Sequence, residues 1–229
     1  MSQLVGVKRN LWFTEQGRVR RANFPIDGLV LYLPLWHPEL TGSPIISKDL
    51  NALSCAVTGA VWTSTGRTFD GSDDTINCGV SDVLNLAAGA HTILMWAKTT
   101  TTDEKYLYLR WTYPSGYGLA ISTARKLQIW AGTDPPGWLA GNSTFNDGLW
   151  HLVGYSKNGT AVTVWLDGQA DGTPTGGVGL TNPGATAYIA SRDGGNCWLG
   201  SIGEGWIYNR IVSAVEANHI YSSTKWRYQ

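Results

Sequence analysis

The chain has 229 residues with 17 basic and 17 acidic side chains, so its formal net charge is zero. A neutral chain has no bulk attraction for nucleic acid or an anionic membrane, and we expect neither as a partner. With 28 glycines, 12 tryptophans and only 15% charged residues, the composition favours short strands joined by tight turns. The length suits one large all-β domain with a sizeable core.

Several other classes of protein are disfavoured by simple counts. No apolar run approaches the roughly 20 residues that a membrane span needs, and the first nine residues lack the apolar stretch of a secretory signal. The three cysteines, Cys55, Cys78 and Cys197, are odd in number and show no Cys-x-x-Cys spacing, so we expect neither a zinc site nor a disulfide framework. One bridge remains open, although we favour buried free thiols.

Residues 1–27 form a basic segment outside the pattern of the main body. We expect a small hairpin here, with Gly17 at its turn. Residues 1–21 contain five basic residues and one acidic residue, Glu15. This charge balance fits either a solvated tail or an arm that anchors the protein to an assembly. The candidate assembly residues of this arm are Lys8, Arg9, Trp12, Phe13, Arg18, Arg20 and Arg21.

From residue 28 onward, apolar stretches alternate with glycine- and proline-rich turns, which predicts many short strands. Pro34 cannot donate a ladder hydrogen bond and predicts an edge strand or a bulge. Asn158-Gly159 predicts a two-residue hairpin turn. Ser213 and Glu216 have capping-box spacing and predict a short helix through about Tyr221. The predicted strands include residues 29–36, 53–57, 61–63 beside 53–57, 91–98, 106–111, 117–122, 126–131, 151–155, 162–168, 187–190 and 197–208; residues 132–137 and 171–184 are predicted loops.

The stretch from residue 66 to residue 79 predicts a strand, a tight acidic turn and a second strand. Phe69 and Ile76 are its apolar anchors, and we expect their two strands to pair as neighbours. Gly71 permits the turn, and Asp73 and Asp74 suit positions where side-chain oxygens cap backbone amides. Phe69-Asp70-Gly71-Ser72-Asp73-Asp74 resembles the central hairpin of the laminin-G-like, concanavalin-A-like jelly rolls.

Other segments resemble the same family in the same order, so the resemblance covers roughly residues 28–222. They include Thr92–Lys98, the late hairpin of 147–153 with 164–168, and the last strand at 200–210. The resemblance implies an all-β, two-sheet antiparallel jelly-roll sandwich over residues 28–229, with residues 1–27 as an N-terminal arm and a short C-terminal helix. Members of this family usually bind glycans or proteins, some are hydrolases or lyases, and some hold one calcium ion.

Calcium would need six to eight oxygen ligands. Candidate donors are Asp70, Asp73, Asp74 and Glu204, although the last strand carries Gly203-Glu204 where the family often has Asp-Glu. The alternative is that Asp73 and Asp74 cap the turn and Glu204 pairs with an arginine. We expect no required cofactor beyond this candidate structural calcium.

We predict that the chain is not an enzyme. Glycoside hydrolysis needs two carboxylates across the scissile bond, and the Glu-x-Asp-x-Glu signature of related glucanases is absent. A glycoside hydrolase or polysaccharide lyase with a carboxylate pair from distant segments is an alternative. The four histidines show no metal or triad spacing.

Glycan binding uses aromatic faces with polar groups nearby. The candidates, which we place in exposed loops, are Trp111, Tyr113, Tyr117 and Trp138, with Arg110, Asp134 and Asn142. Alternatively, these rings pack over the sheet ends or in a subunit interface.

We therefore predict a non-catalytic recognition or structural module. It would be a homo-oligomer or dock through its arm, as a capsid decoration or tail protein of a virion, such as a phage, or at an extracellular surface. An alternative is a cell-surface adhesin that binds carbohydrate. The absence of an export signal together with the basic arm leads to the virion hypothesis.

Overall fold

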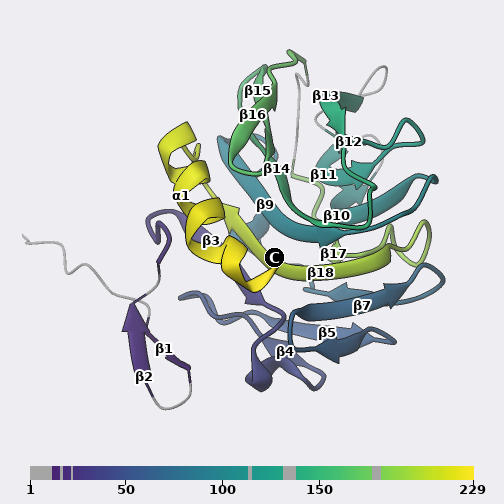
Figure 1. Ribbon diagram of the computed structural model, residues 1–229. Coiled ribbons are helices and arrows are strands. Elements are labelled where there is room, and N and C mark those ends of the chain that lie inside the picture. The colour runs from purple at the N-terminus through teal and green to yellow at the C-terminus, as the bar shows by residue number, and fades with distance from the viewer. Residues whose placement is uncertain (1–11, 16–17, 22, 113–114, 131–137, 177–181) are drawn as a thin grey trace, which may run out of the picture.

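The computed structural model describes residues 12–15, 18–21, 23–112, 115–130, 138–176 and 182–229 (Figure 1). Nearly all regular structure is antiparallel β-strand, arranged as two large sheets that face each other. β1 (Trp12–Glu15) and β2 (Arg18–Arg21) form the expected hairpin as a separate two-stranded sheet. No helix of the described ranges is long and apolar enough to cross a membrane.

One large sheet, which we call the β10 sheet, has eight strands. Its spatial order is β13 (Trp138–Thr144), β12 (Lys126–Trp130), β11 (Ser115–Ile121), β10 (Lys105–Thr112), β17 (Ala187–Ile189), β8 (Thr75–Asn77), β5 (Ser54–Thr58) and β4 (Ile45–Ile46).

The other large sheet, the β9 sheet, has its last strand in sequence at its centre. Its order is β16 (Gln169–Gly172), β15 (Ala161–Leu166), β14 (Trp150–Asn158), β9 (His91–Lys98), β18 (Leu199–Tyr208), β7 (Gly66–Asp70) and β6 (Val61–Thr63), with β3 (Leu29–Pro34) also paired to β18. β18 therefore pairs with β9 along one edge. Along its other edge, its first half pairs with β7 and its second half with β3. β3 ends at Pro34 and pairs only with β18 among the described strands, so the predicted edge position is confirmed.

The core fills the space between the sheets. Ile93, Met95 and Ala97 of β9 point into it, since every second residue of a strand lies on the same face. Leu94 and Trp96 point to the opposite face, where they pack in a second apolar cluster with the C-terminal helix. β9 is thus buried on both of its faces.

The C-terminal helix α1 (Ala214–Thr224) begins at the predicted capping box. Ser213 Oγ accepts a hydrogen bond from the Glu216 backbone N–H, and the Glu216 carboxylate accepts one from the Ser213 N–H. α1 covers the outer face of the β9 sheet (Figure 1), and its residues Ala217 and Ile220 belong to the apolar cluster there. Short 3-10 helices occur at η1 (Pro38–Leu40), η2 (Asp82–Leu84) and η3 (Lys225–Arg227).

The predicted pairing of the Phe69 and Ile76 segments is wrong. β7 belongs to the β9 sheet and pairs with β6 and β18, whereas β8 belongs to the β10 sheet and pairs with β5 and β17. Residues 71–74 therefore make a corner between sheets, since packed sheets lie about 10 Å apart and four residues can span that distance. Phe69 and Ile76 still meet in the core, from opposite sides. For the same reason β6 pairs with β7 and not with the 53–57 strand.

Three smaller predictions also needed correction. The β14–β15 turn is centred on Gly159 and Thr160, one residue later than predicted, because Asn158 already pairs with Ala161. β16 (Gln169–Gly172) includes residues 171 and 172, the first two residues of the predicted 171–184 loop. The strand β13 was not predicted because its second half, Gly141–Thr144, is polar and lacks alternation. The predicted 132–137 loop lies outside the described residues.

Candidate functional site

Aromatic side chains gather on the outer face of the β10 sheet. We call Tyr106, Leu109, Trp111, Trp130 and Trp138 the aromatic face. The ring centroids of Trp130 and Trp138 are 5.1 Å apart, those of Trp111 and Trp130 are 6.2 Å apart, and both pairs meet edge to face. Trp130 is nearly buried, at 8% exposed, while Trp111 and Trp138 are half-buried.

Strand register explains why these rings share a face. Trp130 lies directly opposite Trp138 on the neighbouring strand, and residues directly opposite in a sheet point to the same side. A β-bulge between Tyr106 and Tyr108 shifts the alternation of β10. Because of this bulge, Leu109 and Trp111 point outward with Tyr106.

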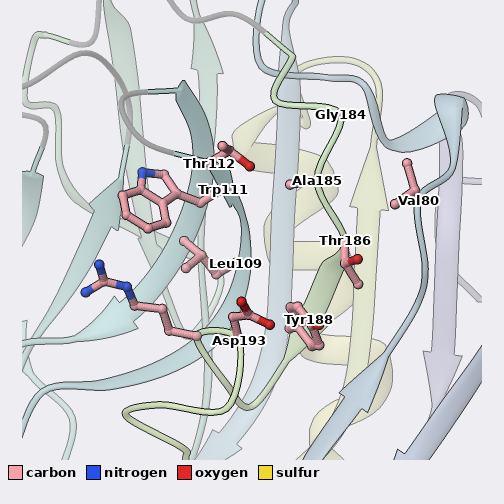
Figure 2. A pocket seen from close by; sticks show the side chains of 10 residues that line it. Val80, Leu109, Trp111, Thr112, Gly184, Ala185, Thr186, Tyr188 and Asp193 are labelled. Carbon is pink, nitrogen blue, oxygen red and sulfur yellow. The ribbon is translucent and has the colours of Figure 1, made fainter.

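A cleft of about 610 Å³ opens beside Trp111 (Figure 2). Leu109 and Trp111 form one wall, Tyr188 of β17 forms the other, and Val80 and Thr186 lie at the far side. The remaining lining residues are Thr112, Gly184, Ala185, Arg192 and Asp193. The cleft thus joins an apolar ring surface to a cation, a carboxylate and hydroxyl groups.

Electrostatic contacts hold the polar groups of the cleft in place. The Arg192 guanidinium carbon lies 4.6 Å from the centroid of the Trp111 ring, within cation–π range. Burial, and next a hydrogen bond with Asp193, raises the pKa of Tyr188. Burial, followed by the Glu104 carboxylate, raises the pKa of Tyr106 to about 12, while Arg192 acts in the opposite direction. Both phenols therefore stay protonated at neutral pH and can donate hydrogen bonds.

The sequence-predicted glycan residues separate into two groups. Trp111 and Trp138 lie on the aromatic face, but in strands and not in the loops that we expected. Asn142 is exposed on β13, and its backbone N–H donates to Asp171 at 2.9 Å. Tyr113 and Asp134 lie outside the described residues.

Tyr117 and Arg110, in contrast, point into the core and are fully buried. The Tyr117 hydroxyl donates to the Leu84 carbonyl and bonds Tyr108, and Arg110 donates to the Ser81 carbonyl. The predictions of Tyr117 as an exposed loop residue and of Arg110 as a polar ligand contact beside it are wrong, because neither side chain reaches the aromatic face.

Sequence reasoning found only Trp111 and Trp138 of this site, and missed, among others, Trp130, Tyr188, Arg192 and Asp193. Trp130 and Gln128 are two residues apart on β12 and therefore lie on the same, outward face of the sheet. This alternation was the signal that could have found Trp130. Arg192 and Asp193 follow β17 in a turn that a residue pattern cannot place over β10.

The acidic corner between β7 and β8 brings three carboxylates together. Oxygen atoms of Asp70, Asp73 and Asp74 lie within 4.8 Å of one another, which suits a hard cation such as Ca²⁺. Asp74 also accepts a hydrogen bond from the Asp70 N–H, and Asp70 accepts one from the Ser72 N–H. Burial, and then the neighbouring carboxylates, raises the Asp74 pKa.

Glu204 does not join this corner. It is 1% exposed on β18, accepts a hydrogen bond from Tyr32, and forms an ion pair with Arg227. Tyr228 also donates to it, at 3.2 Å. The expectation of Glu204 as a fourth ligand beside the three aspartates is therefore wrong, and its pairing with an arginine is the observed alternative.

The sequence matches a family profile over residues 70–218, described as the concanavalin A-like lectin/glucanases superfamily. The chain belongs to this superfamily. No curated protein sequence matches the chain at a significant level.

Solved structures share the fold of this chain at low sequence identity. Trypanosoma rangeli sialidase in complex with sialic acid is 16% identical, with a TM-score of 0.67, over 96% of this chain and 36% of the sialidase chain. The receptor-binding domain of botulinum neurotoxin C/D mosaic serotype is 10% identical, with a TM-score of 0.67, over 87% of this chain and 52% of that chain. This chain thus spans about a third of the sialidase and about half of the neurotoxin domain. A shared fold at this identity carries no assignment of activity, so function has to be argued from the site itself.

Proposed function

We propose that the protein is a non-catalytic recognition module of the concanavalin A-like superfamily, which binds a glycan over the aromatic face and the adjoining cleft. The observation that carries the proposal is the juxtaposition of the half-buried Trp111 with the polar cleft residues Arg192 and Asp193. The receptor-binding and sialic-acid-bound structures of similar fold agree with such a role.

Sugar recognition follows from the chemistry of this surface. The C–H face of a pyranose packs on an indole ring, which gains from burial of apolar area. Arg192, Asp193 and Thr186 supply donors and acceptors for hydroxyl groups at the rim of the same cleft. Arg192 also restrains Trp111 before any ligand arrives, so less conformational entropy is lost on binding.

A glycan array with the full chain tests this proposal. Trp111→Ala and Trp138→Ala should each weaken the best glycan signal at least tenfold, which corresponds to about 1.4 kcal/mol. Trp226→Ala is the matched control, because Trp226 is 62% exposed on η3 and outside the cleft lining. The proposal fails if no glycan binds, or if binding is unchanged in both site variants.

We further propose that residues 1–27 dock the module onto a larger assembly, as in a virion decoration or tail protein. This proposal is supported by the hairpin β1–β2, which pairs with neither sheet of the sandwich in the described strands, and by the basic residues of the segment. Deletion of residues 1–22 should abolish attachment to the particle while glycan binding persists, because it keeps Phe24, which packs against Tyr32 and Trp206 of the sandwich. Unchanged attachment would refute docking without touching the glycan proposal.

An enzyme of this superfamily remains the competing function. The lining of the cleft holds Asp193 as its one carboxylate among the described residues, whereas glycoside hydrolysis needs two. Release of reducing sugar from the glycan identified on the array, abolished in Asp193→Asn, would favour the enzyme. Stable binding without release supports the recognition module.

A further inference from the structure

Cys55 and Cys78 lie opposite each other where β5 and β8 end. The antiparallel register pairs Ala56 with Asn77 and Val57 with Ile76, so its continuation places Cys55 across from Cys78. Both side chains are buried, at 0% and 3% exposed. Both cysteines are free thiols, as predicted, and the Cys55 thiol donates a hydrogen bond to Cys78 Sγ at 2.8 Å, so the two sulfur atoms face each other.

The backbone geometry at this pair also suits a bridge. The Cys78 N–H donates to the Ala187 carbonyl on the β17 side, so it points away from β5. Toward β5, Cys78 thus occupies a non-hydrogen-bonded position, where Cα atoms of antiparallel strands are about 4.5 Å apart. That separation falls at the short end of the Cα distances that disulfides accept, which run from about 4.4 to 6.8 Å.

We propose that Cys55 and Cys78 form a cross-strand disulfide when the protein folds in an oxidising environment. The third cysteine, Cys197, takes no part, because its thiol lies 3.7 Å from the Ser191 hydroxyl in a separate part of the core. The bridge concerns how this fold is stabilised, and it is independent of glycan binding.

The oxidant is a low-molecular-weight disulfide such as oxidised glutathione. One cysteine thiolate attacks it to form a mixed disulfide and expels one glutathione thiolate. The second cysteine then attacks the mixed disulfide, forming the Cys55–Cys78 bond and releasing a second glutathione. The protein loses two protons and two electrons in all, and the two glutathione molecules carry them.

The order of events follows from the surroundings of the pair. The hydrogen bond between the thiols, followed by burial, raises the Cys78 pKa well above its ordinary value, and buried thiols are slow to form the attacking thiolate. The bridge therefore forms during folding, before the second sheet covers the pair. Once formed, it is shielded from reductants by the same burial.

The bridge would close the loop that leaves one sheet and returns to it. Between Cys55 and Cys78 the chain crosses to the β9 sheet, forms β6 and β7, and returns through the acidic corner to β8. A disulfide at the base of this excursion closes a loop in the unfolded chain, which lowers the conformational entropy gained on unfolding.

Disulfide mapping on the full chain tests the proposal without a variant. The protein is refolded in a glutathione redox buffer, quenched in acid, denatured, alkylated and digested. We expect a Cys55–Cys78 linked peptide and alkylated Cys197, and we expect full alkylation of all three cysteines after reduction. Three alkylated cysteines in the refolded protein, or a bridge that involves Cys197, would overturn the proposal.

Thermal unfolding provides a second measurement. The oxidised protein should unfold about 5 to 10 °C above the reduced protein, from the entropy of closing this loop. Cys197→Ser is the matched control and should keep the difference, whereas the double variant Cys55→Ala with Cys78→Ala should show none. Equal midpoints for oxidised and reduced wild-type protein would contradict a stabilising bridge.

Discussion

The two outer faces of the sandwich use tryptophan in opposite ways. On the β9 sheet, Trp96, Trp165 and Trp206 are at most 4% exposed, because α1 and the C-terminal residues cover them. On the β10 sheet, Trp111 and Trp138 remain half-buried, and the one α-helix among the described residues packs on the other sheet. Tryptophan side chains therefore stabilise the packing of one face and are partly exposed on the other.

This difference teaches that exposure, and not aromatic content, separates the two faces. On the covered face two of the three indole N–H groups donate hydrogen bonds, Trp96 Nε1 to Thr224 Oγ1 at 2.8 Å and Trp165 Nε1 to Ser156 Oγ at 2.9 Å. On the aromatic face Trp111 contacts the Arg192 guanidinium, which also borders the cleft. Four predictions test the contrast, from the largest expected effect to the smallest.

Trp96→Ala should reduce the free energy of unfolding by about 3 to 5 kcal/mol, because it removes a fully buried ring from beneath α1. Trp111→Ala should cost far less, because its ring already contacts solvent. Urea unfolding of both variants measures the difference. Equal losses in the two variants would remove the distinction between the faces.

Ser213→Ala should reduce the free energy of unfolding by about 1 kcal/mol, since it removes the N-cap that starts the covering helix. The reduction should loosen the β9 face alone. Amide hydrogen exchange should therefore speed up in α1. The affinity for glycan should stay unchanged. Ser222→Ala, an exposed change near the end of the same helix, serves as the control.

Calcium should bind at the acidic corner between β7 and β8, and on neither outer face of the sandwich. For an affinity typical of extracellular modules, 1 mM calcium would stabilise the fold by about 0.4 to 1.4 kcal/mol. A calorimetric scan should show a higher unfolding temperature, and Asp73→Asn should abolish the shift. Glu204→Gln should preserve the shift, because that carboxylate pairs with Arg227 elsewhere. No shift in the wild-type protein would mean that the aspartates serve the turn alone.

His151 should make stability fall slightly as the solution becomes alkaline. It lies between Asp167, at 2.8 Å, and Asp147, at 3.1 Å, and the Asp167 hydrogen bond raises the His151 pKa. A raised pKa in the folded state gives stability that is complete below the unfolded value of about 6.5 and lost as pH rises through the folded value.

Comparison of urea unfolding at pH 6 and pH 9 measures this effect. His151→Gln should flatten the difference, and the exposed His219→Gln should retain it. Burial lowers the pKa of His91 to about 4, so that histidine destabilises the fold only as pH falls below about 6.5. A wild-type protein equally stable at both pH values would contradict a role for the Asp167 contact.

Much of the fold was readable from local pattern. β9 was predicted residue for residue, because its alternation over residues 91–98 ends at the charged Lys98. The capping box predicted the start of α1 for a similarly local reason. Phe69 and Ile76 were misassigned because two apolar anchors across a tight turn look alike whether the strands pair or belong to facing sheets.

The site was harder to predict because it depends on register. One bulge in β10 decides that Trp111 points outward and Arg110 inward, and regular alternation would place Arg110 on the outside with Tyr106. Trp130 and Trp138 become neighbours through a strand pair whose second member lacks a regular pattern. Arg192 reaches Trp111 from a segment about 80 residues away, which no local signal encodes.

The central place of β18 has a consequence for synthesis in the cell. Its partners β3, β7 and β9 all emerge from the ribosome long before it does, and the gap between them stays open until residue 208 is translated. During that interval the nascent chain carries unpaired strand edges, which are templates for association with other chains. We expect prematurely stopped products to aggregate, and chaperones to remain engaged until translation is nearly finished.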